Sequence, residues 1–153
     1  MRPAVAAAAA AVVLAAMSLT GCAAAAPGIV GLQRSGGHVH AYVRMCGGES
    51  VDTLRMIELG GTFHDTWTFD APVTGTGTYD LGVYDDSVVL IDTGNTFSLE
   101  ASSSTSDVEP RGLTFASGDL ATLKAGKILV RDGSSLVQLD EDGFETLAAA
   151  SCG

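Results

Sequence analysis

The chain is short of positive charge. Its 153 residues include 8 Lys and Arg against 18 Asp and Glu, so the formal net charge is −10, and only Lys124 and Lys127 are lysines. Nucleic-acid binding needs clustered cations that neutralise phosphates, and binding to an anionic membrane surface needs a similar basic patch. The composition therefore excludes nucleic acid and an anionic membrane surface as expected partners.

Motifs of the common enzyme classes are also missing. There is no Gly-x-Ser-x-Gly or Ser-x-x-Lys nucleophile motif and no Cys-x-x-Cys pair. Glycine-rich turns such as Gly47-Gly48 lack the strand–loop–helix setting of a phosphate site. We therefore expect a protein that is not an enzyme and that binds no cofactor.

The first 21 residues have the pattern of an export signal. Arg2 supplies a positive start, and residues 3–19 then run without charge and are mostly Ala and Val. This stretch of about 17 residues lies at the lower limit for crossing a bilayer. We expect residues 1–21 to be a signal peptide that is removed.

The end of this segment, Leu19-Thr20-Gly21-Cys22, resembles the lipobox of bacterial lipoproteins. The resemblance implies cleavage between Gly21 and Cys22 and attachment of a diacylglyceryl group to the Cys22 sulfur. The alternative is an ordinary signal peptide cleaved among residues 23–26. Two acyl chains anchor a protein stably, so we expect the acylated Cys22 to hold the protein in the lipid bilayer at the outer face of the cell membrane.

Three cysteines are an odd number for an exported protein. If Cys22 carries lipid, Cys46 and Cys152 remain, and an oxidising compartment favours a disulfide between them. The loop so closed, of about 107 residues, corresponds to about 4–5 kcal/mol on the chain-entropy model. The alternative is a pair of free thiols.

After Ile29 the dominant pattern is period-2 alternation between turns, and no window of helical length has a 3.6 period. Strands are expected at residues 29–33, 38–46, 51–59, 64–70, 78–83, 88–91, 96–101, 113–116, 127–131 and 136–139. Residues 102–110 are expected to be a loop, and 117–123 a helical turn capped by Ser117 or Asp119. Asp132-Gly133 predicts a tight hairpin.

Eight to ten short strands with Gly-rich turns predict an all-β fold. We expect an antiparallel β-sandwich of the immunoglobulin or fibronectin type, with a small β-barrel as the alternative. The expected core aromatics are Phe63, Trp67, Phe69, Phe97, Phe115 and Phe144. Residues 22–28 are then the lipidated Cys with a short tether, and residues 29–153 form the single domain.

Several segments together resemble small lipoproteins of actinobacteria, the high-GC Gram-positive bacteria. They are the lipobox, Gly28–Leu32, Cys46-Gly47, the Trp67 strand, Thr96–Leu99, Leu113–Phe115 and Asp119–Val130. The resemblance implies anchoring at the cell envelope and no particular activity.

Three histidines are the candidate metal ligands. His38 and His40 lie two apart and so share one face of a strand, where two imidazoles could meet one metal ion with His64 as a third ligand. The other interpretation is a solvated strand face, and we expect no metal site. Residues 140–145 with Asp132 are rich in carboxylates but lack the spacing of a calcium loop, which favours a solvated turn.

The sequence therefore predicts a membrane-anchored extracytoplasmic lipoprotein whose β-domain binds or scaffolds a ligand or protein of the envelope without catalysis. The alternative is a metal-binding protein or hydrolase that uses the His38/His40 face.

Overall fold

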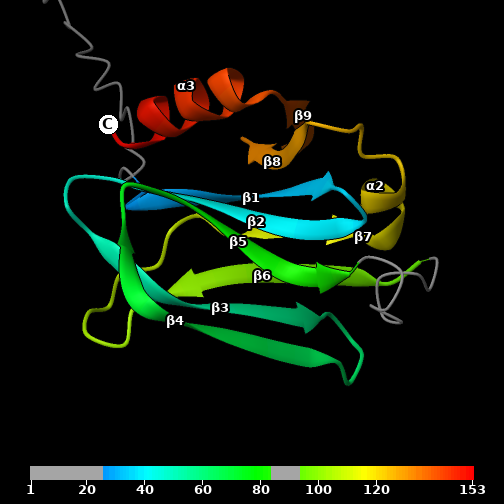
Figure 1. Ribbon diagram of the computed structural model, residues 1–153, viewed down its shortest axis with the longest axis horizontal. Coiled ribbons are helices and arrows are strands. Elements are labelled where there is room, and N and C mark those ends of the chain that lie inside the picture. Colours follow the sequence, from blue (N-terminus) through cyan, green and yellow to red (C-terminus); the bar gives the residue numbers. More distant parts are fainter. Residues whose placement is uncertain (1–25, 84–93) are drawn as a thin grey trace, which may run out of the picture.

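A computed structural model describes residues 26–83 and 94–153, which form two β-sheets with a helix on the outer face of one (Figure 1). The strands are β1 (Gly28–Ser35), β2 (His38–Met45), β3 (Ser50–Glu58), β4 (His64–Thr74), β5 (Thr76–Val83), β6 (Thr96–Ser102), β7 (Leu113–Ala116), β8 (Ile128–Asp132) and β9 (Ser135–Leu139). The helices are α2 (Ser117–Ala121) and α3 (Glu141–Ser151). The strand expected at residues 88–91 and the signal segment lie outside the described residues.

The sheets are antiparallel and pack face to face. The first has the order β5-β2-β1-β8-β9, and the second has the order β4-β3-β6-β7. Among the described strands, β5 and β9 are edges of the first sheet, and β4 and β7 are edges of the second. The all-β sandwich is therefore confirmed, and the closed barrel is wrong.

The connectivity of seven strands follows the immunoglobulin pattern. If β1, β2, β3, β5, β6 and β7 are strands A, B, C, E, F and G, one sheet contains A-B-E and the other contains C-F-G. β4 then pairs with strand C, where a C′ strand lies in variable-type domains. The β8–β9 hairpin extends the first sheet beyond β1.

The core between the sheets comes from the inward residues of alternating strands. In β2, the residues Val39, Ala41, Val43 and Met45 are all buried, as the alternation predicts. Phe97 and Phe115 stack within this core with ring centroids 5.7 Å apart. The other expected aromatics of the sandwich, Phe63, Trp67 and Phe69, are partly buried against it.

The helix α3 was not expected, and the interpretation of residues 140–145 as a solvated turn is wrong. Asp140 is the N-cap, and its side chain accepts a hydrogen bond from the Gly143 N–H at 2.9 Å. Phe144 and Ala148 are buried in a second core with Ile29, Ile128 and Val130 on the outer face of the first sheet. The acidic residues thus form the first turn of a helix, where carboxylates favour the helix dipole.

Two further boundaries differ from the expectation. β4 continues through Pro72 to Thr74, because Pro is tolerated in an edge strand, and the chain changes sheet at Gly75, whose φ is +74°. The β8–β9 hairpin forms as expected, but Asp132 pairs with Ser135, so the two turn residues are Gly133 and Ser134.

The short helix α2 forms where the sequence predicts it. Its first turn is closed by Asp119, whose carboxylate accepts a hydrogen bond from the Ala116 N–H at 2.7 Å. Ser117 is buried, and its hydroxyl accepts a hydrogen bond from the Gly94 N–H at 3.1 Å. Neither helix within residues 26–83 and 94–153 has the length and apolar character to cross a membrane.

Candidate functional site

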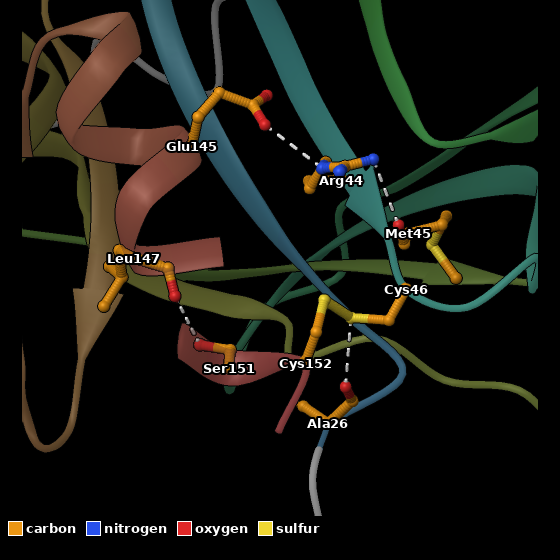
Figure 2. The surroundings of a disulfide bond; sticks show 8 residues. All are labelled: Ala26, Arg44, Met45, Cys46, Glu145, Leu147, Ser151 and Cys152. Carbon is orange, nitrogen blue, oxygen red and sulfur yellow. Dashed lines mark hydrogen bonds and ion pairs between the residues drawn. A yellow bond between two sulfur atoms is a disulfide. The ribbon is translucent and has the colours of Figure 1, made fainter. Parts of the chain in front are cut away.

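A disulfide bond lies at the end of the domain where the described chain begins. Cys46 and Cys152 are bonded, with Cα atoms 5.4 Å apart, and this confirms the expected pair (Figure 2). Cys46 follows the last residue of β2, and Cys152 is the C-cap of α3. The bond therefore joins the first sheet to the helix that covers it.

The first described residues lie against the same disulfide. The Cys46 N–H donates a hydrogen bond to the Pro27 carbonyl oxygen at 2.8 Å, and the Cys46 sulfur lies 3.4 Å from the Ala26 carbonyl oxygen (Figure 2). A disulfide sulfur has no proton to donate, so the second approach is a contact only. Gly21 and Cys22 lie outside the described residues, and Cys22 precedes Ala26 by four positions.

An ion pair beside the disulfide connects the middle of α3 to two strands. Arg44 Nε of β2 lies 3.1 Å from Glu145 Oε2 (Figure 2). The Thr76 hydroxyl of β5 donates to Glu145 Oε1 at 2.8 Å. Both ion-pair side chains are about one-third exposed, so solvent screens much of the attraction. The contacts orient α3 across the sheet more than they stabilise it.

The histidines do not converge. His38 and His40 share the outer face of β2, with ring centroids 6.1 Å apart, whereas His64 lies on β4 of the other sheet. Residues 26–83 and 94–153 contain no group of three His, Cys, Asp or Glu side chains placed to hold a metal ion.

His38 instead pairs with a carboxylate of the neighbouring strand. Its Nδ1 lies 2.8 Å from Asp80 Oδ2, and Asp80 Oδ1 accepts a hydrogen bond from the Gly82 N–H at 2.9 Å. These contacts, the Gly82 N–H first and His38 after it, lower the pKa of Asp80 below its usual 3.8. About half of each side chain is exposed to solvent, so the pair sits on an open surface and not in an enclosed site.

A hollow lies on the outer face of the other sheet, over β3, β6 and β7. It has a volume of about 550 Å³, and its lining is mostly polar. Arg55 of β3 pairs in register with Glu100 of β6, and Arg55 Nη2 lies 2.8 Å from Glu100 Oε2 on the groove floor. The hydroxyl of Ser98 also donates to Glu100, at 3.2 Å. We call this hollow the sheet groove.

The sheet groove exists because β7 is short. β7 pairs with β6 only from Thr96 to Leu99, so the remaining part of β6 extends past it. The loop before β7 fills that place, and its residues Glu109, Pro110 and Gly112 form a wall. The period-2 alternation expected for residues 96–101 places Ser98 and Glu100 on the face opposite Phe97 and Leu99, but it does not predict the strand register that sets Glu100 opposite Arg55.

The comparisons with known proteins found no matching family model, no matching curated protein and no matching solved structure.

Proposed function

We propose that the protein is an exported lipoprotein, anchored by diacylglycerol on Cys22 at the outer face of the cell membrane, and that its immunoglobulin-type domain binds an envelope component without catalysis. The observation that carries the proposal is the fixation of Ala26 and Pro27 against the Cys46–Cys152 disulfide, directly after the lipobox. A rigid domain thus begins four residues after the cysteine that would carry the lipid.

This spacing limits how far the domain stands from the membrane. Four residues of extended chain span at most about 14 Å, because each adds about 3.3–3.6 Å. The end that carries Ala26, Cys46 and Cys152 would therefore face the bilayer. The outer face of the second sheet is polar over β3, β6 and β7 and is suited to binding at such a surface. The proposed likeness to small actinobacterial lipoproteins would imply the same placement.

A metal carrier or hydrolase on the His38/His40 face is the competing function. The His38–Asp80 pair is the observation that favours it, since a carboxylate on one ring nitrogen fixes the tautomer and leaves the other nitrogen available. His64 is on the other sheet, so such a site would need a different third group.

The test is the fate of the chain in its native host, or in a bacterium that processes lipoproteins. We expect the full chain in the membrane fraction, with intact mass showing loss of residues 1–21 and gain of a diacylglyceryl group. Cys22→Ser should abolish the lipid mass and the membrane association.

The matched control is the Cys46→Ser/Cys152→Ser double variant. It removes the other two cysteines and should still carry the lipid, whatever its stability. Unchanged membrane association of Cys22→Ser would refute the anchor.

A further inference from the structure

We infer that the sheet groove is a binding site for a neutral saccharide. This inference specifies the ligand class of the proposed binding function, and it rests on that function only for the place, the cell envelope, where the protein would encounter the saccharide. The groove floor combines one fixed donor group, Arg55, one fixed acceptor group, Glu100, and hydroxyls that do both. The volume of about 550 Å³ lies within the 300–1,000 Å³ range of small-molecule sites.

The chemistry of the lining selects the class of ligand. Thr53, Ser98, Ser102 and Thr114 line the groove with hydroxyls. The Thr53 and Ser98 hydroxyls donate to Asp52 and Glu100, so each has its lone pairs left to accept from a ligand. A saccharide presents the same groups at close spacing, and a carboxylate such as Glu100 can accept from two neighbouring hydroxyls. An apolar ligand would remove water from these polar groups without offering hydrogen bonds in return.

The charge of the groove argues against an anion. Its lining holds one cation, Arg55, and two carboxylates, Glu100 and Glu109. Arg55 is already engaged by Glu100 at 2.8 Å, so a phosphate or carboxylate would meet net negative charge in a protein of net charge −10. A neutral polyhydroxyl ligand needs no charge compensation.

The position of the groove brings it close to the start of the domain. Arg111, between the wall residues Pro110 and Gly112, donates its N–H to the Gly28 carbonyl oxygen at 2.8 Å. Its own carbonyl oxygen accepts from the Val30 N–H at 3.1 Å. The groove wall is thus bonded to the first strand, so on an anchored protein it would lie near the membrane surface.

The test is binding of defined trisaccharides to the full chain purified in detergent. Maltotriose, mannotriose and chitotriose are the neutral probes, trigalacturonate is the anionic probe, and the glucosamine trimer is the cationic probe. We expect at least one neutral probe to bind and to shift the NMR amide signals of Thr53, Ser98 and Thr114.

Two conservative variants locate the site. Glu100→Gln and Thr114→Val keep the size of each side chain but remove a charge or a hydroxyl, and each should weaken binding at least tenfold. Asp80→Asn, which neutralises an ion-paired carboxylate on the outer face of the other sheet, should leave binding unchanged.

Three outcomes would overturn the inference: no neutral probe shifts the groove signals, only a charged probe binds, or Asp80→Asn weakens binding as much as Glu100→Gln does. None of these readouts depends on lipid. If they fail while Cys22→Ser still releases the protein from membranes, the ligand class is wrong and the anchor stands.

Discussion

At the scale of single residues, Gly31 shows how closely α3 is packed on the first sheet. A Cβ atom at this position would lie 2.6 Å from Ile128 Cγ2 and 3.1 Å from Phe144 Cε2. Both neighbours belong to the second core, which holds the helix against β1 and β8. Glycine is required here by space and not by backbone angle, because only a residue without a side chain admits the ring of Phe144.

We predict that Gly31→Ala destabilises the protein by about 1–3 kcal/mol, the usual cost of overpacking. The measurement is the urea unfolding midpoint. Gly118→Ala is the matched control, since a Cβ there meets nothing within 4 Å and lies in helix α2. The control should raise stability by up to about 1 kcal/mol. Equal effects of the two variants would contradict the packing argument.

Asp140 is a second residue with a local role that can be measured. The Gly143 N–H and then Lys127 lower the pKa of Asp140 below its usual 3.8. A carboxyl whose pKa is lowered by folding stabilises the protein at pH values above 3.8, and this contribution is lost as the pH falls through the folded value.

We predict that Asp140→Asn unfolds with a weaker dependence on pH below about 4, because Asn caps a helix as well as Asp but does not titrate. At neutral pH its stability should be close to that of the parent protein. The measurement is the urea midpoint between pH 7 and pH 3, and the control is Asp107→Asn, which changes an exposed carboxylate of the 103–112 loop. If Asp140→Asn loses stability below pH 4 as steeply as the parent protein does, the role given to the Asp140 carboxylate is wrong.

At the scale of elements, strands were predictable from the sequence and α3 was not. In β2 and β6 every second residue is apolar, and each of these apolar residues is buried. The helix has only Phe144 and Ala148 fully buried, so its periodic signal is weak. What makes it a helix is the apolar outer face of β1 and β8, which are about 110 and 10 residues away from it in sequence and which local patterns do not reveal.

In the candidate site, too, some features could be predicted from the sequence and others could not. The disulfide could be predicted by counting cysteines in an exported chain, because only one pairing remains once Cys22 is assigned to lipid. The sheet groove depends on the register of β3 against β6 and on the short length of β7, which are properties of distant pairing. The separation of His64 from His38 likewise follows from the distribution of strands between the sheets.

The disulfide is expected to act first on α3. We predict that reduction, or Cys46→Ser with Cys152→Ser, lowers the free energy of unfolding by up to about 4–5 kcal/mol, because the closed loop spans 106 positions. Hydrogen exchange should increase earliest in α3 and at the ends of β1 and β2, and last in β3 and β6. A uniform increase over both sheets would contradict this order.

At the scale of the whole molecule, the turns between strands lie at two opposite ends of the sandwich. One end carries Ala26, the β2–β3 turn with Glu49, the β4–β5 turn at Gly75 and the C-terminus (Figure 1). The opposite end carries the β1–β2 turn, the β3–β4 turn with Thr62, and α2. If Cys22 carries the proposed lipid, the end with Ala26 faces the bilayer.

We predict that a fluorophore placed at Glu49 is quenched strongly by a headgroup-labelled lipid, and that one placed at Thr62 is quenched weakly. Both positions are exposed turns, so each variant should fold. The measurement uses the lipidated full chain in vesicles, and Cys22→Ser with either label is the control that should show no quenching. Equal quenching at both positions would contradict the proposed orientation.

The central position of β1 also determines how the domain carries mechanical load. A pull transmitted through Ala26 runs along β1, which is hydrogen-bonded on both sides, to β2 over its whole length and to β8 at Gly31, Leu32 and Gln33. These bonds lie across the pulling direction and are loaded together in shear, so they must break as a group. The covalent link from Cys46 to Cys152 passes part of the force to α3. A ligand held in the sheet groove contacts the other sheet and the loop before β7, so part of its pull would reach β1 through the bonds of Arg111 to Gly28 and Val30.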